Sequence, residues 1–297
     1  PDPDNLQYEC ARAAIADCAL QKGWDREKVH VWLDVCSIPQ KNKSQQLSAI
    51  SSLPIYASSA HAFIVIAPEA VHKDLCQVCS LETYQNRAWC RAELLSHSLA
   101  NGVDDMFLAN SHNKIEPVRL GSAMMNEAIY VFEGELSCCR KSHEGLPCCD
   151  RERLMVPFLG LYGLQHVLKT KGTMEEQMQM GDFLNAIDKQ ESRVFPSDIG
   201  VVLKDKGTGK TKTEKRVLFK GLLDKMKRRA DQMHGDDLQK FGFNTVVQHE
   251  GSDADGSSKA KLVVTRTRTT ASIASMTPHL SVPSESSLKN AMHAAES

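Results

Sequence analysis

The sequence predicts an α/β fold in which a mainly parallel β-sheet carries helices on both faces. Apolar runs of strand length alternate with segments whose apolar residues recur at helical spacing. A strand–helix–strand order implies right-handed crossovers and parallel pairing of the strands. The chain has 297 residues, of which 41% are hydrophobic, so it is long enough to form one or two domains.

The first two predicted elements are a helix and a strand. Residues 6–18 place apolar side chains at helical spacing, and Asp4 and Gly23 can cap the two ends of this helix. Val29–Val35 is a run rich in β-branched residues, which predicts a buried strand. A sheet of this kind normally begins with a strand, so we expect that a first strand precedes Pro1.

The next predicted elements continue the alternation. A helix is predicted over Ser44–Ser59, with a bend at Pro54, and a buried strand over His61–Ala67. A further helix is predicted over Trp89–Leu99 and a further strand over Ala128–Phe132. The two strands that flank the first of these helices should therefore be parallel neighbours in one sheet.

Composition divides the chain into three parts. Residues 1–135 form the α/β domain, residues 136–240 a mostly helical extension, and residues 241–297 a low-complexity tail that we expect to be disordered. Within the extension, residues 204–229 hold 11 basic and 3 acidic side chains. A partial apolar stripe there predicts a basic amphipathic helix. Such a helix would bind a membrane surface or a partner helix or, alternatively, pack on the domain as a solvated helix.

Charge and cysteine content exclude several classes of protein. The net charge is −1, whereas dedicated nucleic-acid binders are usually basic, so no specific nucleic-acid partner is expected. No apolar run approaches the roughly 20 residues that cross a bilayer. The chain has 10 cysteines, too few for its length to form a disulfide-rich secreted scaffold. They indicate a reducing compartment, the cytosol or the nucleus, and we predict a cytoplasmic location.

Two segments carry the most specific pattern in the sequence. Residues 31–40 read Val-Trp-Leu-Asp-Val-Cys-Ser-Ile-Pro-Gln, and residues 87–94 read Arg-Ala-Trp-Cys-Arg-Ala-Glu-Leu. The first would run from the end of a strand into a loop, and the second would begin a helix. Because ligands of parallel α/β sheets bind beyond the carboxyl ends of the strands, both segments are predicted to lie at a binding edge.

These segments resemble the Toll/interleukin-1 receptor (TIR) superfamily. The second is similar to the plant-type TIR signature Trp-Cys-x-x-Glu-Leu, and the first resembles the family's second strand running into its BB loop. A secondary resemblance is to the heterokaryon-incompatibility domain, although Ala92 stands where that pattern favours Gln. The resemblance covers roughly residues 1–135 and implies a flavodoxin-like, TIR-like sheet that lacks its first strand.

The resemblance also implies a site. In enzymatic TIR domains the matching glutamate, here Glu93, is the catalytic residue that cleaves nicotinamide from NAD. One carboxylate suffices because nicotinamide leaves as a neutral pyridine, so no acid is needed, and an ionised Glu93 would stabilise the oxocarbenium-like charge. We expect the positive end of the helix dipole to favour that ionised form. The predicted substrate-binding residues are Asp34, Ser37, Gln40, Arg87 and Trp89.

Non-catalytic interpretations of the same residues remain open. Glu93 can instead be a solvated helix residue that pairs loosely with His97 or an arginine, and Asp34 can be a carboxylate that caps a loop. The alternative function is a non-enzymatic scaffold that self-associates through the loop Cys36–Gln46. NAD is expected as a substrate, and no resident cofactor is predicted.

The remaining cysteines allow a metal site but do not favour one. Cys76-x-x-Cys79 looks like half of a zinc site, and Cys138-Cys139, Cys148-Cys149 and His143 could supply further ligands. Their spacing matches no standard zinc finger, and adjacent cysteines do not easily ligate one ion. We therefore predict no metal and reduced loop thiols, with a structural zinc as the alternative.

Overall fold

The computed structural model describes residues 4–39, 42–71, 76–110, 114–119, 121–143, 148–171, 174–205, 207–233, 243–250 and 259–266. The helices are α1 (Leu6–Gln21), α2 (Asp34–Ser37), α3 (Lys43–Ser59), α4 (Leu81–Asn86), α5 (Ala88–Asn101), α6 (Ala123–Ala128), α7 (Ser137–Arg140), α8 (Asp150–Lys171), α9 (Met174–Lys189), α10 (Glu191–Val194) and α11 (Leu222–Gln232). Short 3₁₀ turns lie at Arg26–Lys28 and Val131–Glu133. The strands are β1 (Phe63–Ile66), β2 (Ala70–Val71), β3 (Val78–Cys79), β4 (Met106–Ala109), β5 (Glu116–Pro117), β6 (Asp198–Lys204), β7 (Thr211–Val217), β8 (Phe243–Glu250) and β9 (Lys259–Arg266).

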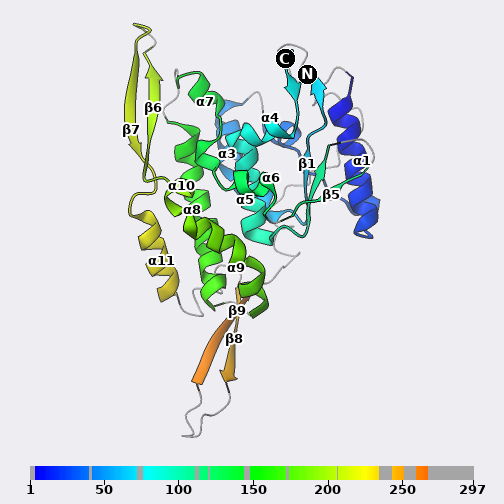
Figure 1. Ribbon diagram of the computed structural model, residues 1–297, viewed down its shortest axis with the longest axis vertical. Helices are drawn as coiled ribbons and strands as arrows, with labels where there is room; N and C mark the ends of the chain where they lie inside the picture. The colour runs from blue at the N-terminus through cyan, green and yellow to red at the C-terminus, as the bar shows by residue number, and fades with distance from the viewer. Residues whose placement is uncertain are drawn as a thin grey trace.

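The structure is mixed α/β, and a small mixed sheet lies next to α1 (Figure 1). The strand order of that sheet is β1-β4-β5; β1 and β4 are parallel, and β5 is antiparallel to β4. Phe63 pairs with Met106 and Ile66 with Ala109 along the parallel pair. Because these two strands run the same way, the chain between them must cross back, and α5 lies in that crossover.

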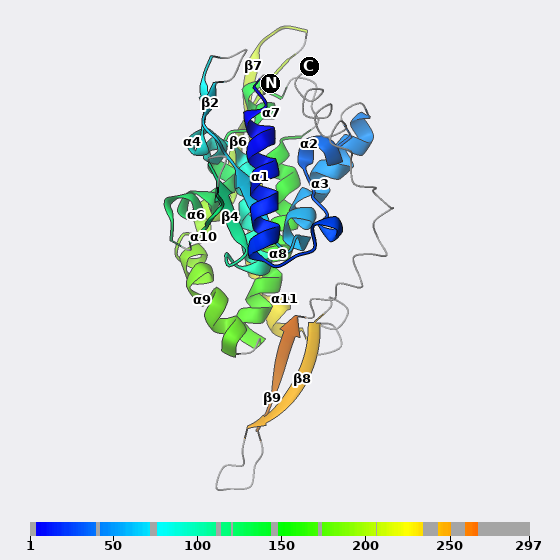
Figure 2. The ribbon, with the colours of Figure 1, turned by 90° about the vertical axis from the view of Figure 1, so that its right-hand side faces the viewer.

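Side chains of β1 alternate between two cores, as a strand buried on both faces requires. Ile64 and Ile66 pack with the apolar face of α1, around Cys10 and Cys18. The intervening Val65 points into the larger core, which contains the apolar face of α5. Figure 2 shows α1 standing across one face of the sheet. The sheet is therefore covered on both faces, but by one helix on the α1 side.

Four predicted elements of the first half are confirmed. The helices over residues 6–18, Ser44–Ser59 and Trp89–Leu99 are found as α1, α3 and α5, and the strand over His61–Ala67 is found as β1. Pro54 lies inside α3, and Gly23 follows α1 with a φ of 63°, a left-handed conformation that suits glycine. Each of these elements has a clear apolar period or run, which is why the sequence predicts them.

The predicted strand Val29–Val35 is wrong. Residues 29–33 form no strand, and the short helix α2 begins at Asp34. The segment lies against α3 instead, where the Trp32 ring stacks on Tyr56 at a centroid distance of 5.5 Å, while Val31 remains 46% exposed. The parallel neighbour of β1 is consequently β4, and not the segment before α3.

The predicted strand Ala128–Phe132 is also wrong. Ala128 ends α6, and residues 131–133 form a 3₁₀ turn. Phe132 lies in the main core, in edge-to-face contact with Phe158 and Phe219 at 6.2 and 5.0 Å between ring centroids. A short apolar run can be buried in a helical turn as well as in a strand. Periodicity alone therefore cannot distinguish the two.

The second half of the chain is largely helical, as predicted, but it also contains a β-hairpin. Figure 1 shows α8, α9 and α11 side by side, with the β6–β7 hairpin extending beyond α10. The basic segment 204–229 is not one amphipathic helix: its first part belongs to this antiparallel hairpin and its second part to α11. The apolar residues of α11 pack on α8 and the core, with Leu223 and Ala230 buried.

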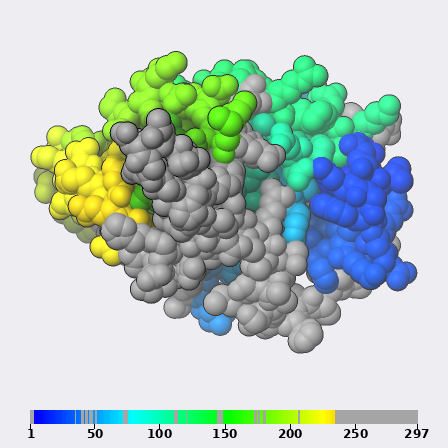
Figure 3. Space-filling model, turned by 90° about the horizontal axis from the view of Figure 1, so that it is seen from below, coloured from blue at the N-terminus to red at the C-terminus, as the bar shows by residue number. Residues whose placement is uncertain are grey.

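The C-terminal segment contains a second antiparallel hairpin, formed by β8 and β9. It projects beyond the ends of α8 and α9 in both ribbon views (Figures 1 and 2). The remainder of the tail that we expect to be disordered lies outside the described residues. Seen from the end that carries the helical extension, α1 and α11 lie on opposite sides of the molecule (Figure 3).

Candidate functional site

The start of α5 is fixed by a close backbone contact with residues 134–135. The amide of Ala88 donates to the carbonyl of Glu135 at 2.9 Å, and the amide of Glu135 donates to the carbonyl of Asn86 at 2.7 Å. Gly134 packs so closely that a Cβ there would lie 2.6 Å from the Ala88 Cα. Only glycine fits this position without movement of the backbone. The start of α5 is thus held in place by residues 134–135.

Helix α3 is joined to the later turns of α5. The His97 Nδ1 atom lies 3.0 Å from the carbonyl oxygen of Ala57, and the Asn101 Nδ2 atom donates to the carbonyl of Ser58 at 2.8 Å. Since Trp32 stacks on Tyr56 of the same helix, the chain just before α2 is carried toward α5. Asp34, at the start of α2, lies close enough to Glu93 in the second turn of α5 for its charge to act on that carboxyl.

Glu93 is the central side chain of the resulting group. It is half-buried, and burial raises the pKa of its carboxyl to about 8. The negative charge of Asp34 raises it further, while the guanidinium of Arg87 opposes the rise. The expected effect of the helix dipole is therefore outweighed: Glu93 lies in the second turn, where the dipole is weak, and loss of water favours the neutral acid.

Two further groups share this environment. Burial raises the pKa of the Cys90 thiol to about 12, against the lowering effect of Arg87. Burial, followed by the charges of Cys90 and Glu93, raises the pKa of Tyr84 well above its usual value. We call Asp34, Tyr84, Arg87, Cys90 and Glu93 the Glu93 cluster. At neutral pH its interior groups are largely protonated, and Arg87 provides a positive charge at its rim.

Arg91, one turn from Arg87, has a different role. Its side chain is buried and donates to the carbonyls of Gln85 at 2.5 Å and Tyr130 at 3.1 Å. These contacts tie α5 to the end of α4 and to the turn after α6. Arg91 is therefore a structural residue of the site's framework, and its guanidinium does not face a ligand.

The structure brings together some of the predicted site residues. Asp34 comes from α2, and Arg87 and Glu93 come from the start of α5; the charges of Asp34 and Arg87 both act on Glu93. Ser37 is exposed at the end of α2, and Trp89 packs against the hydrophobic core. Gln40 lies outside the described residues. Tyr84 and Cys90 were missed by sequence reasoning, although Cys90 lies inside the Trp-Cys-x-x-Glu-Leu pattern itself.

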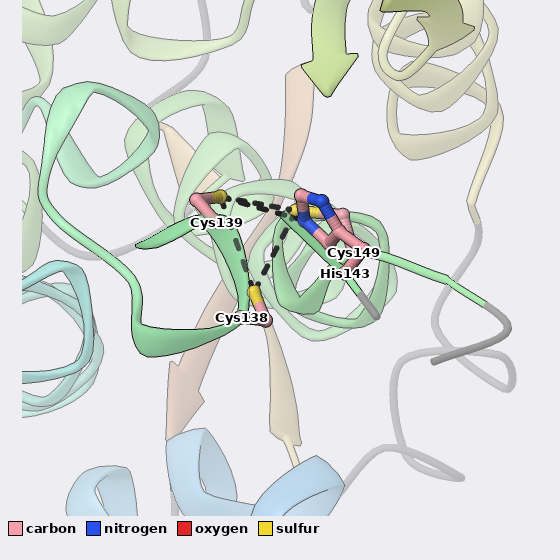
Figure 4. A group of neighbouring side chains, drawn as sticks. All are labelled: Cys138, Cys139, His143 and Cys149. Atoms are coloured by element: carbon pink, nitrogen blue, oxygen red, sulfur yellow. Dashed lines mark hydrogen bonds between the residues drawn. The ribbon is translucent and has the colours of Figure 1, made fainter. Parts of the chain in front are cut away.

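A second cluster of reactive groups lies between α7 and α8. The ligand atoms of Cys138, Cys139, His143 and Cys149 all lie within 4.8 Å of one another (Figure 4). We call these four residues the thiol cluster. All cysteines of the chain are free thiols. The sequence argument that adjacent cysteines are hard to place around one ion does not hold at this turn, because the Cys138 and Cys139 sulfurs are 4.0 Å apart.

Comparisons with known proteins give no match. No protein-family model, curated protein or solved structure is similar to this chain at a significant level. Among the described residues, no helix combines the length and the apolar character needed to span a membrane.

Proposed function

We propose that the chain is a TIR-like signalling domain with a flavodoxin-like core, and that it hydrolyses NAD to nicotinamide and ADP-ribose through Glu93. The observation that carries this proposal is the desolvated Glu93 carboxyl, with Asp34 and Arg87 close enough to change its pKa. Carboxyl groups with strongly raised pKa values are more frequent at active sites than elsewhere.

The location of the cluster supports the proposal. The chain leaves β1 at its carboxyl end and returns through α5 to the parallel strand β4. The first turns of such a crossover helix lie beyond the carboxyl ends of the strands, where parallel sheets bind their ligands. Glu93 and Arg87 both lie in or beside these first turns.

The chemistry needs one anion and one cation from this chain. The nicotinamide ring of NAD carries a positive charge, so its binding beside Glu93 would favour the carboxylate over the acid. That carboxylate would stabilise the oxocarbenium-like ribose as nicotinamide departs as a neutral molecule. Water then adds to the ribose carbon and loses a proton, which gives ADP-ribose. Arg87 would attract the pyrophosphate of the substrate.

The test is the Glu93→Gln variant in a nicotinamide-release assay with purified protein and NAD. We expect wild-type protein to release nicotinamide and the variant to lose at least about 100-fold in kcat, the order of effect seen when one electrostatic group is removed. Glu82→Gln, at an exposed carboxyl of α4, serves as a control that makes the same chemical change and leaves the Glu93 cluster in place. Equal rates for Glu93→Gln and wild type would refute the assignment.

A second candidate function is self-association without catalysis. Three large apolar side chains on the chain before α2 and on α3 are exposed: Val31, Ile55 and Tyr56, at 46%, 60% and 44%. Exposed apolar side chains that form a patch are typical of interaction surfaces. Under this hypothesis, Ile55→Asp lowers the oligomeric mass in analytical ultracentrifugation, and Glu93→Gln leaves it unchanged.

A further inference from the structure

Four of the six distances between ligand atoms in the thiol cluster are close to those around a tetrahedral metal ion, and all six are within 4.8 Å. The sulfur of Cys149 lies 4.0 Å from that of Cys138 and 3.7 Å from that of Cys139, and the Cys139 sulfur lies 3.6 Å from His143 Nε2. Zinc–sulfur bonds of ~2.3 Å and zinc–nitrogen bonds of ~2.0–2.1 Å give tetrahedral edges of about 3.8 Å between sulfurs and about 3.6 Å between sulfur and nitrogen. We propose that Cys138, Cys139, His143 and Cys149 bind one Zn²⁺ in a structural site.

The backbone turn after α7 explains how two adjacent cysteines and the histidine reach one point. The amide of His143 donates to the carbonyl of Cys138 at 2.9 Å, and the amide of Ser142 donates to that of Cys139 at 2.9 Å. Ser142 and His143 have positive φ angles of 47° and 53°, which are uncommon for residues other than glycine. This turn places the His143 ring beside Cys149, as Figure 4 shows, with its Nε2 atom toward the Cys139 thiol.

The ligands His143 and Cys139 have the outer hydrogen-bond partners that are typical of a metal site. The His143 Nδ1 atom lies 2.8 Å from the carbonyl oxygen of Val202 on β6, so Nδ1 carries the proton and Nε2 presents its lone pair to the thiols. The guanidinium of Arg151 donates to the Cys139 sulfur at 2.8 Å. Three thiolates and one Zn²⁺ leave a net charge of −1, and Arg151 balances that charge.

Burial indicates a structural ion and not a catalytic one. Cys138, His143 and Cys149 are 4%, 4% and 1% exposed, and four protein ligands fill a tetrahedral zinc, so no position is left for water or substrate. Cys138 and Cys149 also pack with Ala88 at the start of α5 and with Val201 of β6. The ion would therefore fasten α7, the start of α8 and the β6–β7 hairpin to the body of the protein.

Cys148 is a nearby thiol that does not belong to the thiol cluster. Cys148 precedes Cys149 directly, yet its sulfur accepts a hydrogen bond from Arg153 Nε at 3.3 Å and it is outside the cluster. A disulfide would need about 2.05 Å between sulfurs, roughly half the 4.0 Å between Cys138 and Cys149. Tetrahedral sites of sulfur and nitrogen ligands are the usual preference of zinc among the common divalent metals.

The experiment measures the metal content of the full chain purified under reducing conditions with zinc in the medium. We expect one zinc per chain in wild type and in the matched control Cys148→Ser. Cys149→Ser and His143→Asn should lose at least ten-fold in bound zinc. Equal zinc in Cys149→Ser and Cys148→Ser would overturn the proposal.

A second measurement uses only the wild-type chain, so it does not depend on the folding of the variants. X-ray absorption at the zinc edge should show three sulfurs at ~2.3 Å and one nitrogen at ~2.0–2.1 Å. Cobalt exchanged into the site should give the intense visible bands of a tetrahedral thiolate complex. A shell of oxygen ligands, or a metal-free chain with a Cys138–Cys149 disulfide by mass spectrometry, would overturn the proposal.

Discussion

The Glu93 cluster and the thiol cluster are both groups of ionisable side chains, but their electrostatics differ. In the thiol cluster each member has a polar partner: the sulfurs contact one another, His143 contacts the Val202 carbonyl, and Arg151 donates to Cys139. In the Glu93 cluster, Asp34 and burial both disfavour the charged form of Glu93. The partners within the thiol cluster offset part of the cost of burying its polar groups, whereas the Glu93 carboxyl is desolvated beside a like charge, which costs stability.

The largest expected effect is a pH dependence of the free energy of unfolding that arises in the Glu93 cluster. A carboxyl whose pKa is about 8 in the folded chain and 4.5 when unfolded binds more protons when folded, so the free energy of unfolding falls as pH rises between these values. The Glu93→Gln variant should not show this decrease in the free energy of unfolding. At pH 9 the variant should be more stable than wild type, by at most about 5 kcal/mol, and at pH 4 the two should be equal. Chemical denaturation at both pH values measures this, and equal stability at pH 9 would contradict it.

The next effect comes from the contact that the two regions share. A Cβ at residue 134 would lie 2.6 Å from the Ala88 backbone, so Gly134→Ala must displace the start of α5. Arg151 donates to the carbonyls of Phe132 and Gly134 and also to Cys139, so the thiol cluster is disturbed as well. We expect a loss of about 2–3 kcal/mol in the free energy of unfolding. Gly160→Ala, at an exposed site with nothing within 4 Å of the new Cβ, is the control.

A smaller effect tests the electrostatics of the Glu93 cluster directly. Asp34 raises the pKa of Glu93 and Arg87 lowers it. Asp34→Asn should therefore lower that pKa, and Arg87→Gln should raise it. Carbon-13 chemical shifts of the Glu93 carboxyl across pH 4–10 measure both changes. A shift of the same sign in the two variants would show that neither residue acts through its charge.

The smallest effect concerns a site far from both clusters. Lys171 at the end of α8 donates to the carbonyls of Ala230, Asp231 and Met233, at 2.9, 3.0 and 2.7 Å, and so caps the end of α11. Lys171→Met should lower the free energy of unfolding by about 1–2 kcal/mol. It should change neither the zinc content nor the pKa of Glu93. A change in either would show that the clusters are coupled through α8.

The sequence predicted the structural features that depend on a local pattern of residues. The helix that carries Glu93 has a clear apolar period, and the expected proximity of Asp34 and Glu93 agrees with their electrostatic coupling. The prediction failed for Val29–Val35 because β-branched residues indicate a strand only where a neighbouring strand exists to pair with. The raised pKa of Glu93 was also missed, since it depends on how completely other segments exclude water from the second turn of α5.

The sequence offered the residues of the thiol cluster as an alternative zinc site but did not favour that site, and the reason is different. Its assembly depends on left-handed backbone at Ser142 and His143, and neither residue type signals that conformation in a sequence. The Val202 carbonyl that orients His143 comes from a strand predicted as part of a helix-rich extension. A search for Cys-Cys-x₃-His-x₅-Cys would have found the four side chains, but only the turn shows that their ligand atoms can converge.

The span of each cluster along the chain also sets the order in which the two can form. Cys138 and Cys149 are 11 residues apart, whereas Asp34 and Glu93 are separated by 93 − 34 = 59 residues. Closing the longer loop costs about 1.5 kcal/mol more in chain entropy. During folding the thiols can therefore meet first. Until α2 arrives, Glu93 lacks the like charge of Asp34 that favours its neutral acid, so it is more readily ionised before this longer loop closes.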